Sequence, residues 1–405
     1  MAAFAEAGNR GPNIRSDAYL RIEPTDTGGI VIDLKSKVSS LYGKTIQRLL
    51  HEGLKHYNIT AARVTVEDSG ALPFVLMARL ETAVKRLNPQ AGDFLPPLKA
   101  GCQYTSKRDR FRRSRLYLPG NQPKFMINAG LHKPDGVILD LEDSVSANEK
   151  DAARILVRNA LRSVDFYGAE RMVRVNPGEM GMQDISAIIA HNVHLLLIPK
   201  AEDRQTIQAF STHIEKEKQR LQVEQDIFLM PIIESAKGVL NAYEIAAASP
   251  MNVALAIGLE DYTKDICTSR SADQKESFLA RSMVVNAARA CGLQPIDTVF
   301  SDVTDMAGLR ASVREAKQLG FDGKGCIHPR QIHVIHDAFA PTEAEITKAK
   351  AVYLAFEKAK ARGLGVVSLG SKMIDPPVVK RALKTIDMAV SYGLLAHDWQ
   401  KGEEQ

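Results

Sequence analysis

The sequence has few cysteines, and they form no recognisable pattern. Its 405 residues include four cysteines that lie far apart, with no C-x-x-C pair and no Cys/His spacing of a structural zinc site. This scarcity argues against a structural metal centre built on cysteine. Reduced thiols, either buried or incidental, are the expectation.

Long apolar runs and an excess of charge are also missing. The N-terminus MAAFAEAGNR has no basic stretch followed by an apolar one, and no later segment approaches eighteen uninterrupted apolar residues. The net charge of +5 is small for this length, and contents of 45% hydrophobic and 25% charged residues are ordinary for a soluble globular protein. We therefore expect a cytoplasmic enzyme or binding protein, with neither nucleic acid nor a membrane as its partner.

A change in residue composition divides the chain near residues 88–114. Prolines and glycines, and then the basic run KRDRFRRSR, replace periodic hydrophobicity there. This pattern predicts a linker over residues 91–113. The basic run is either solvated, as charged runs beside linkers usually are, or available for the phosphates of a ligand.

Before the linker, residues 1–90 have the pattern of a small α+β domain. YLRIEP and GIVIDLKS indicate two strands around a Thr-Gly-Gly turn, and an amphipathic helix follows over residues 43–57. A third strand, ARVTVED, and a second helix, PFVLMARLETAVKRL, complete the domain.

After the linker, apolar runs alternate with helical stretches. Continuous apolar character is typical of parallel strands buried on both faces, and eight such strands alternating with helices predict a (β/α)8 TIM barrel over residues 114–340. A C-terminal helical segment over residues 341–405 follows. The eight candidate strands are RLYLP, GVILDLE, RMVRVN, HLLLIPK, IFLMPIIE, NVALAIGLED, QPIDTVFSD and GKGCIHP.

Polar residues end most of these runs. The C-terminal ends of barrel strands meet at one face, where active sites of such barrels lie, so these residues predict a charged mouth. They are Glu142, Asp143, Arg174, Asn176, Lys200, Glu234, Glu260, Asp261, Asp297, Asp302 and His328.

The segment VILDLED, residues 137–143, carries three carboxylates in four residues. In a dry site these groups would repel and raise one another's pKa values, so they must be hydrated, hydrogen-bonded or near a cation. The segment is thus either a solvated acidic turn or part of a cation site. Asp140 is expected to be a structural member of the turn.

Glu234 and Asp261 end consecutive candidate strands and would lie side by side in a barrel. Two neighbouring carboxylates with room for water suit Mg²⁺, although such a pair can also cap helices or bind arginines. Under the metal hypothesis, Glu142 and Asp143 would hold waters beside the ion.

Two cations at strand ends leave further alternatives open. Arg174 either forms a structural salt bridge with the acids or binds a substrate carboxylate or thioester carbonyl, where it could stabilise an enolate. Lys200 either balances charge or forms a Schiff base, although a Schiff-base enzyme would not need the Glu234/Asp261 pair.

Ordered segments over residues 113–390 resemble the citrate lyase β-subunit group of the HpcH/HpaI aldolase superfamily, which includes malyl-CoA and citramalyl-CoA lyases. The matching segments are RSRLYLPGNQPKF, GVILDLEDSV, MVRVNP, LLLIPK, PIIESAKGVLNAYEIA, AIGLEDYTKDI, IDTVFSDVTD, GFDGKGCIHPRQI and SKMIDPP.

This resemblance implies Mg²⁺-dependent cleavage of a β-hydroxyacyl thioester to an α-keto acid and an acyl thioester. It implies that Glu234 and Asp261 are metal ligands and that Arg174 binds substrate. Glu142 and Asp143 would order water beside the metal. The resemblance also implies a homo-oligomer, trimeric or hexameric, and allows for other citrate lyase subunits as partners.

The same resemblance assigns roles to the loops. Asp375 matches a late aspartate that reaches over the mouth, commonly that of a neighbouring subunit, as acid or base, which makes residues 341–405 a lid. Gly120, Asn121 and Lys124 lie where related enzymes approach CoA.

The N-terminal domain resembles a different protein, the acyl-carrier γ-subunit of citrate lyase, through SDAYLRIEP, GIVIDL, YGKTI and VEDSGALPFVLMARLETAVKRL. That family attaches a CoA-derived arm to a serine, but Arg15 stands at the matching position and Ser16 lies one residue later. Either Ser16 carries the arm, or the arm is absent and free CoA thioesters are used. The second alternative is favoured slightly.

The primary interpretation is a carbon–carbon lyase that cleaves a citryl thioester to oxaloacetate and an acetyl thioester. Malyl-CoA or citramalyl-CoA cleavage, or a malate-synthase-like condensation with a thioesterase step, are alternatives on the same scaffold. A non-catalytic thioester carrier or assembly subunit is the alternative of another class.

Overall fold

The computed structural model describes residues 4–271, 273–361, 367–369 and 372–402. The chain divides into two compact units, which meet between Ile335 and His336. The first unit contains a small α+β domain and a closed barrel, and the second is helical.

The N-terminal domain is a four-stranded sheet with two helices. The strand order is β1-β2-β4-β3, in which β4 pairs antiparallel with β2 and parallel with β3. The two strands expected around the Thr-Gly-Gly turn therefore flank β4, and the short β1 was not predicted. The elements are β1 (Ala5–Ala7), β2 (Ala18–Pro24), β3 (Ile30–Ser36), α1 (Ser39–His56), β4 (Ala62–Asp68) and α2 (Pro73–Leu87).

Helix α2 is buried on more than one side. Every residue from Phe74 to Val84 is buried, because one side of the helix packs on the domain's own core and the other contacts α4 (Lys150–Ser163) of the barrel. This double burial accounts for the lack of an exposed polar face in PFVLMARLETAV.

A buried ion pair fixes α2 on α4. The Arg158 guanidinium donates to both Glu81 carboxylate oxygens, at 2.9 and 2.6 Å, and both side chains are almost fully buried. Asn159 also donates from its side chain to the Phe74 carbonyl at 3.1 Å. The carrier-like domain is thus held in place by specific contacts.

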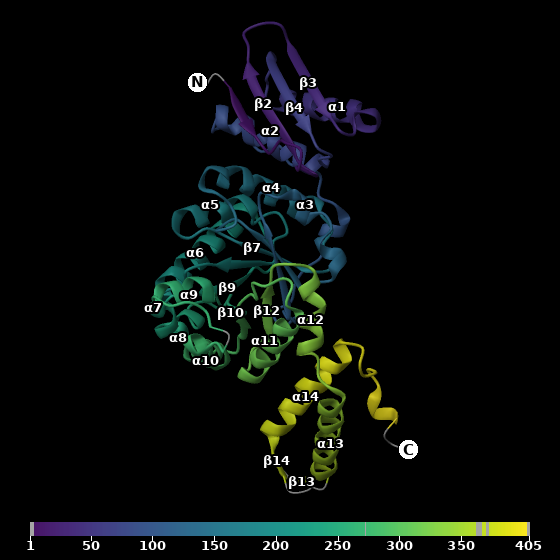
Figure 1. Ribbon diagram of the computed structural model, residues 1–405, viewed down its shortest axis with the longest axis vertical. Coiled ribbons are helices and arrows are strands. Elements are labelled where there is room, and N and C mark those ends of the chain that lie inside the picture. The colour runs from purple at the N-terminus through teal and green to yellow at the C-terminus, as the bar shows by residue number, and fades with distance from the viewer. Residues whose placement is uncertain (1–3, 272, 362–366, 370–371, 403–405) are drawn as a thin grey trace. The chain divides into compact units, whose positions relative to one another are not determined.

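The barrel closes in the order β10-β11-β12-β5-β6-β7-β8-β9 with parallel pairing throughout, so the predicted (β/α)8 architecture is confirmed (Figure 1). Each of the eight candidate segments supplies one strand. The strands are β5 (Ser114–Pro119), β6 (Gly136–Asp140), β7 (Glu170–Arg174), β8 (Leu195–Ile198), β9 (Phe228–Ile233), β10 (Ala254–Ile257), β11 (Gln294–Asp297) and β12 (Gly323–Cys326).

Helices surround the strands, which are buried from both sides; β8 and β9 have no exposed residue. Besides α4, the helices of this ring are α3 (Pro123–Met126), α5 (Gly178–Ile188), α6 (Arg204–Leu221), α7 (Ala236–Leu240), α8 (Ala242–Ala246), α9 (Leu259–Asp265), α10 (Lys275–Ala290), α11 (Met306–Leu319) and α12 (Arg330–Phe339).

The basic run before the barrel corrects an expectation. Arg112 is fully buried and paired with Glu170 at 2.7 Å, and Arg113 pairs with Asp135 at 2.6 Å. Both acids lie at the N-terminal ends of strands, so these arginines close the floor of the barrel. The expectation is therefore wrong for Arg112 and Arg113, which carboxylates at the floor neutralise, whereas Lys107 and Arg108 at the start of the run are exposed.

Hydrogen bonds also hold Tyr104, which lies earlier in the predicted linker, against the barrel. The Tyr104 carbonyl accepts from Arg171 at 2.9 Å and lies 2.8 Å from Nε2 of His194. Burial, together with the positive charge of Arg171, lowers the pKa of His194 to about 3, so the ring is neutral at physiological pH.

The second unit contains two long helices, α13 (Glu343–Lys360) and α14 (Pro376–Ser391), and a short hairpin of β13 (Val367–Leu369) and β14 (Lys372–Ile374). A Thr342/Glu345 capping box begins α13. The helices share an apolar core that includes Val352, Ile374 and Ile386.

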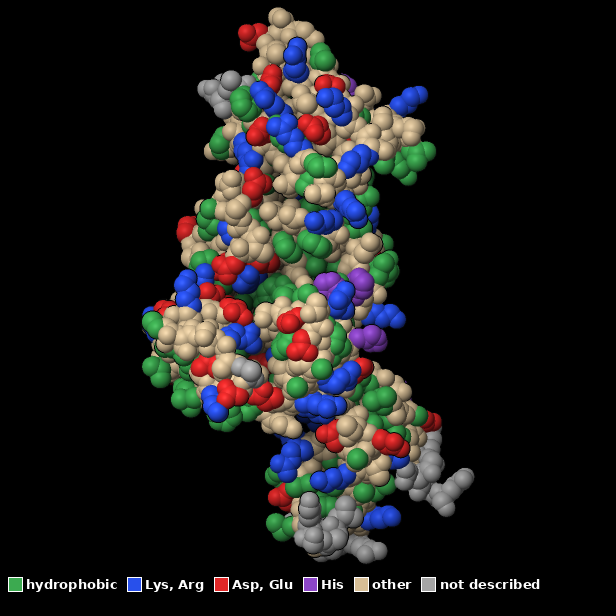
Figure 2. Space-filling model, viewed as in Figure 1, with side chains coloured by type: hydrophobic (Ala, Val, Ile, Leu, Met, Phe, Trp, Pro, Cys, Tyr) green, Lys and Arg blue, Asp and Glu red, His purple; other side chains and the backbone are tan. Residues whose placement is uncertain are grey.

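The surface carries charges of both signs. Figure 2 shows lysines and arginines interspersed with acidic side chains over the visible face, in agreement with the small net charge. Among the described residues, no helix is long and apolar enough to cross a membrane. All four cysteines are free.

Glu81→Gln is expected to lower the free energy of unfolding by about 3 kcal/mol, because it leaves the buried Arg158 without its main counter-charge. Urea denaturation measures this change. Glu52→Gln is the control, since Glu52 faces Arg48 at 4.0 Å in an exposed pair worth about 0.5 kcal/mol or less. Equal stability of the two variants would contradict the buried α2/α4 contact.

Candidate active site

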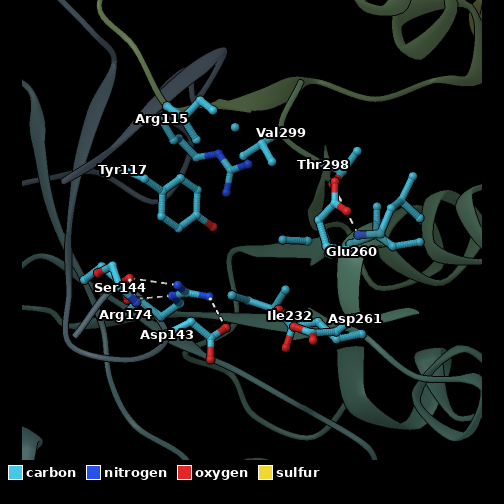
Figure 3. Close-up of a pocket in the computed structure, with 18 of the residues that line it drawn as sticks. Arg115, Tyr117, Asp143, Ser144, Arg174, Ile232, Glu260, Asp261, Thr298 and Val299 are labelled. Carbon is cyan, nitrogen blue, oxygen red and sulfur yellow. Dashed lines mark hydrogen bonds and ion pairs between the residues drawn. The ribbon is translucent and has the colours of Figure 1, made fainter. Parts of the chain in front are cut away.

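A cavity of about 480 Å³ opens among the C-terminal ends of the barrel strands. We call it the mouth cavity. Figure 3 shows Arg174, Asp143 and Ser144 on one side of it and Asp261 on the other. Its lining includes Arg115, Tyr117, Pro119, Asp140, Asp143, Ser144, Arg174, Ile232, Glu234, Ala256, Gly258, Glu260, Asp261, Thr298, Val299 and Gly325.

Asp140 ends β6 and organises the acidic turn. Its carboxylate accepts from the backbone N–H groups of Glu142 at 3.0 Å and Ser144 at 3.2 Å, and from two guanidinium nitrogens of Arg174 at 2.7 and 2.8 Å. Burial would raise the pKa of Asp140, but the hydrogen bonds and charge of Arg174 outweigh it and lower the pKa. The expected structural role of Asp140 fits this geometry.

Arg174 ends β7 and lies among three acids. Besides Asp140, its guanidinium reaches Glu142 at 2.8 Å and Asp143 at 3.5 Å. Burial alone would lower the pKa of Arg174, but Asp140 and the other acids raise it well above its ordinary value. The salt-bridge alternative is therefore realised, and the same side chain lines the mouth cavity.

Lys200 balances the charge of Glu142. Its ammonium lies 2.6 Å from the Glu142 carboxylate, and this hydrogen bond raises the pKa of Lys200. Burial raises the pKa of Glu142, while Arg174 and Lys200 oppose the change. A Schiff base requires a neutral amine, so this contact opposes the Schiff-base alternative.

Glu234 follows β9 and is a buried acid of the site. It is 6% exposed and accepts from the Lys200 backbone N–H at 3.0 Å. Burial and the neighbouring Glu142 together raise its pKa to about 8, against the opposing charge of Arg174. This carboxylate would be stabilised in its charged form by a nearby cation.

The backbone leaves room for the Glu234 side chain. A Cβ atom at Gly258 would lie 2.8 Å from both Cγ and Oε1 of Glu234, which is closer than real contacts allow. Glycine at position 258 therefore permits the Glu234 carboxylate to lie against the strand end.

Asp261 lies in the first turn of α9 and also lines the cavity. Within the part of the chain that the structure describes, its carboxylate has no hydrogen-bond or ion-pair partner. Two carboxylates with oxygen atoms available for coordination thus face one cavity.

This donor set fits a hard cation. In the described ranges, no group of three or more His, Cys, Asp or Glu side chains could hold a metal, so a site closed by protein ligands alone is not formed there. Mg²⁺ prefers oxygen ligands and usually keeps several waters around one or two carboxylates. The pair Glu234/Asp261 therefore suits Mg²⁺ better than zinc.

Three loop residues expected near CoA are not among the residues that line the mouth cavity. The Gly120 N–H donates to the Asp140 carbonyl at 2.8 Å, and a Cβ at Gly120 would lie 2.5 Å from that oxygen. Asn121 accepts through its carbonyl from Arg79 at 3.3 Å, and Lys124 is exposed. Their role in CoA binding stays a prediction.

Ser16 and Asp375 also lie outside the cavity lining. Ser16 is partly exposed, has a left-handed backbone with φ of 56°, and is followed by Asp17, which pairs with Arg79 at 2.9 Å. Asp375 belongs to the second unit, where it caps α14 by accepting from the Val378 N–H at 3.1 Å. The roles expected of both residues stay predictions.

Two residues expected at the mouth pair with other side chains of the protein. Asn176 donates to Asp184 at 2.7 Å, and the fully buried Asp297 pairs with Lys324 at 2.7 Å and Arg281 at 3.1 Å. Asp297 also lines the mouth cavity, as expected, whereas Asn176 is not among the lining residues.

Sequence reasoning missed Arg115 and Tyr117, which line the cavity from inside the barrel. The Arg174 guanidinium lies 5.4 Å from the Tyr117 ring centroid. Both missed residues occupy alternate positions of β5, so the two-residue period of RLYLP could have identified them.

Comparisons with known proteins agree with this geometry. Residues 113–329 match the family described as HpcH/HpaI aldolase/citrate lyase, and residues 11–87 match the malonate decarboxylase delta subunit (MdcD). The N-terminal domain is therefore acyl-carrier-like, as expected.

Curated relatives cover the barrel. The citrate lyase subunit beta of Leuconostoc mesenteroides subsp. cremoris is 40% identical over 69% of this chain and 94% of its own length. The human mitochondrial citramalyl-CoA lyase is 33% identical over 69% and 86%. A (3S)-malyl-CoA thioesterase of Cereibacter sphaeroides is 34% identical over 68% and 94%.

Among solved structures, the protein CitE from Mycobacterium tuberculosis in complex with magnesium, acetoacetate and coenzyme A matches with a TM-score of 0.58 and 29% identity, over 70% of this chain and 99% of that one. This chain therefore belongs to the HpcH/HpaI aldolase/citrate lyase family, with an acyl-carrier-like domain ahead of its lyase barrel.

Proposed function

We propose that the protein is a Mg²⁺-dependent carbon–carbon lyase, which cleaves a β-hydroxyacyl thioester to an α-keto acid and an acyl thioester. The observation that carries this proposal is the buried Glu234, which shares the mouth cavity with Asp261 and Arg174. Relatives that act on citrate, citramalyl-CoA and malyl-CoA support the substrate class.

Glu234 and Asp261 are the proposed metal ligands. Bound Mg²⁺ would supply Lewis acidity for the negative charge that develops on oxygen during cleavage. Glu142 and Asp143 orient water on the Arg174 side of the cavity, where Lys200 and Arg174 hold their carboxylates.

Arg174 positions the substrate. The Asp140 fork fixes its guanidinium, which binds a substrate carboxylate or the thioester carbonyl from the wall of the cavity. In the cleavage direction a base removes the β-hydroxyl proton, the C–C bond breaks, and its electron pair forms the thioester enolate. An acid then protonates the enolate carbon, and Asp375, acting over the mouth as part of a C-terminal lid, is the proposed acid.

Other features of the proposal come from relatives. Gly120, Asn121 and Lys124 are the proposed CoA contacts. Donation of Asp375 by a neighbouring subunit would require a homo-oligomer, for which we propose a trimer or hexamer. Other citrate lyase subunits are proposed as further partners. A cytoplasmic location is proposed as well.

The carrier-like domain is proposed to be a fixed appendage, so free CoA thioesters are the substrates. Arg158 and Glu81 hold α2 on the barrel, whereas a shuttling carrier would need to detach. The non-catalytic alternative has less support, because an assembly subunit would not need the Glu234/Asp261 pair.

We expect Mg²⁺-dependent release of a keto acid when the protein is mixed with citryl-CoA, citramalyl-CoA or malyl-CoA, since all three have the same bond to break. A coupled dehydrogenase assay measures oxaloacetate, pyruvate or glyoxylate. Glu234→Gln should abolish release while the fold persists. Absence of release from every thioester with saturating Mg²⁺ would rule out the lyase.

Gly258→Ala should weaken Mg²⁺ binding by roughly tenfold or more, because the added Cβ displaces the Glu234 carboxylate. Gly258 has φ of −110°, which alanine also adopts, so backbone strain does not contribute. Calorimetric Mg²⁺ titration measures the change. Gly92→Ala is the control, since nothing lies within 4 Å of its added Cβ; equal affinities would argue against Glu234 as a ligand.

The peptide containing Ser16 should have an unmodified mass when the protein is purified from its native host, and Ser16→Ala should keep full activity on free CoA thioesters. Mass spectrometry of the intact chain and of its peptides tests the first expectation. An added arm on Ser16, together with lost activity in Ser16→Ala, would instead establish a working carrier.

A further inference from the structure

Arg115 is a buried cation at the mouth cavity that the proposed reaction does not yet use. It is the second residue of β5 and 1% exposed, and it lines the cavity together with Tyr117 two positions later. Figure 3 shows its side chain extending toward the open space between Tyr117 and Val299. Arg115 thus lies deeper in the barrel than the residues at the strand ends.

The guanidinium of Arg115 has no carboxylate partner among the described residues. One terminal nitrogen donates to the Met230 sulfur at 3.1 Å and the other to the Asp297 carbonyl at 3.4 Å, while Nε has no partner. Thioether sulfur is a weak acceptor, and the carbonyl contact is long. Most of the hydrogen-bonding capacity of this arginine is unused.

The nearby acid cannot serve as its counter-ion. The Asp297 carboxylate already pairs with Lys324 at 2.7 Å and with Arg281 at 3.1 Å. The buried Arg112 and Arg158 have a carboxylate within 2.7 Å, and the buried Arg171 donates to the Asn192 and Tyr104 carbonyls at 2.7 and 2.9 Å. Arg115 has neither a carboxylate nor a carbonyl that close, so its guanidinium is available to an anion from outside the protein.

A buried, uncompensated guanidinium is costly, and arginine does not escape the cost by losing its proton. The cavity lining also includes the apolar Ile232 and Ala256, and the Asp297 carboxylate in it is already held by Lys324 and Arg281. A carboxylate that entered this region would meet one strong cation and little other polar competition.

We propose that Arg115 binds a second carboxylate on the keto-acid half of the substrate and so selects the acyl group. This inference rests on the proposed lyase function. Arg174 and the Glu234/Asp261 pair would hold the groups beside the bond that breaks. Arg115 would receive a carboxylate attached through one methylene group to the carbon that bears the hydroxyl. The substrate is then a citryl thioester, which yields the dicarboxylate oxaloacetate; in citramalyl and malyl thioesters a methyl group or a hydrogen replaces this carboxymethyl group.

The test compares Arg115→Met, which keeps the unbranched part of the side chain and removes the guanidinium with its charge, with Arg115→Lys. The wild type should prefer citryl-CoA to citramalyl-CoA in kcat/KM by roughly 100-fold or more, because citramalyl-CoA has no distal carboxylate to pair with the buried Arg115. Arg115→Met should lose most of that preference, with kcat/KM for citramalyl-CoA changed by less than about threefold, and Arg115→Lys should restore part of it. An equal loss on both substrates, or no loss, would overturn the inference.

A binding experiment separates this inference from the lyase proposal. Malate and lactate differ only in a carboxylate in place of hydrogen at the distal carbon, so calorimetric titration of each in the presence of Mg²⁺ reports on the distal subsite alone. Malate should bind the wild type at least tenfold more tightly than lactate, and Arg115→Met should bind both equally. The ligand-free Arg115→Met variant should also unfold at a temperature no lower than the wild type, because an uncompensated charge is removed.

The outcomes are distinct. If no thioester is cleaved but the malate preference depends on Arg115, the subsite stands and the lyase proposal fails. If thioesters are cleaved and neither preference depends on Arg115, the subsite inference fails alone.

Discussion

A buried charge is costly without a counter-charge, and the fork between Arg174 and Asp140 supplies one at the centre of the active site. Asp140 accepts two backbone N–H groups as well, so the fork fixes the turn that carries Glu142 and Asp143. Glu142 in turn pairs with Arg174 and Lys200, and the Lys200 backbone holds Glu234. One ion pair thereby connects the acidic turn to the proposed metal ligand.

The same requirement organises regions remote from the mouth. Glu170 and Asp135 neutralise the arginines that precede the barrel and so attach that segment to the floor. Glu81 and Arg158 attach the carrier-like domain through α2. Separating the two partners of a buried ion pair would leave a charge buried without compensation, which strongly destabilises the fold. These contacts therefore specify where each segment lies.

The sequence predicted the secondary-structure elements better than it predicted which charged side chains pair with one another. Eight apolar runs identified the barrel because burial on both faces leaves a continuous apolar signal in each strand. Periodicity does not reveal which carboxylate meets which cation, so the pairs of Arg112 with Glu170 and of Lys324 with Asp297 were not predicted. Glu234, Asp261 and Arg174 were identified because each follows or ends a strand, whereas Arg115 lies inside one and was overlooked.

The charge balance of the mouth links the metal and substrate proposals. Asp140, Glu142 and Asp143 pair with Arg174 and Lys200, and Glu260 pairs with Arg270. Glu234 and Asp261 have no ion-pair partner among the described residues, so a divalent cation would balance their two charges. The cations near the strand ends are then fully engaged, and each substrate carboxylate must share Arg174 or the metal, or find another positive group. Among the described residues that line the cavity, Arg115 is the cation without a carboxylate, so a substrate with a distal carboxylate is the one that the charge distribution favours.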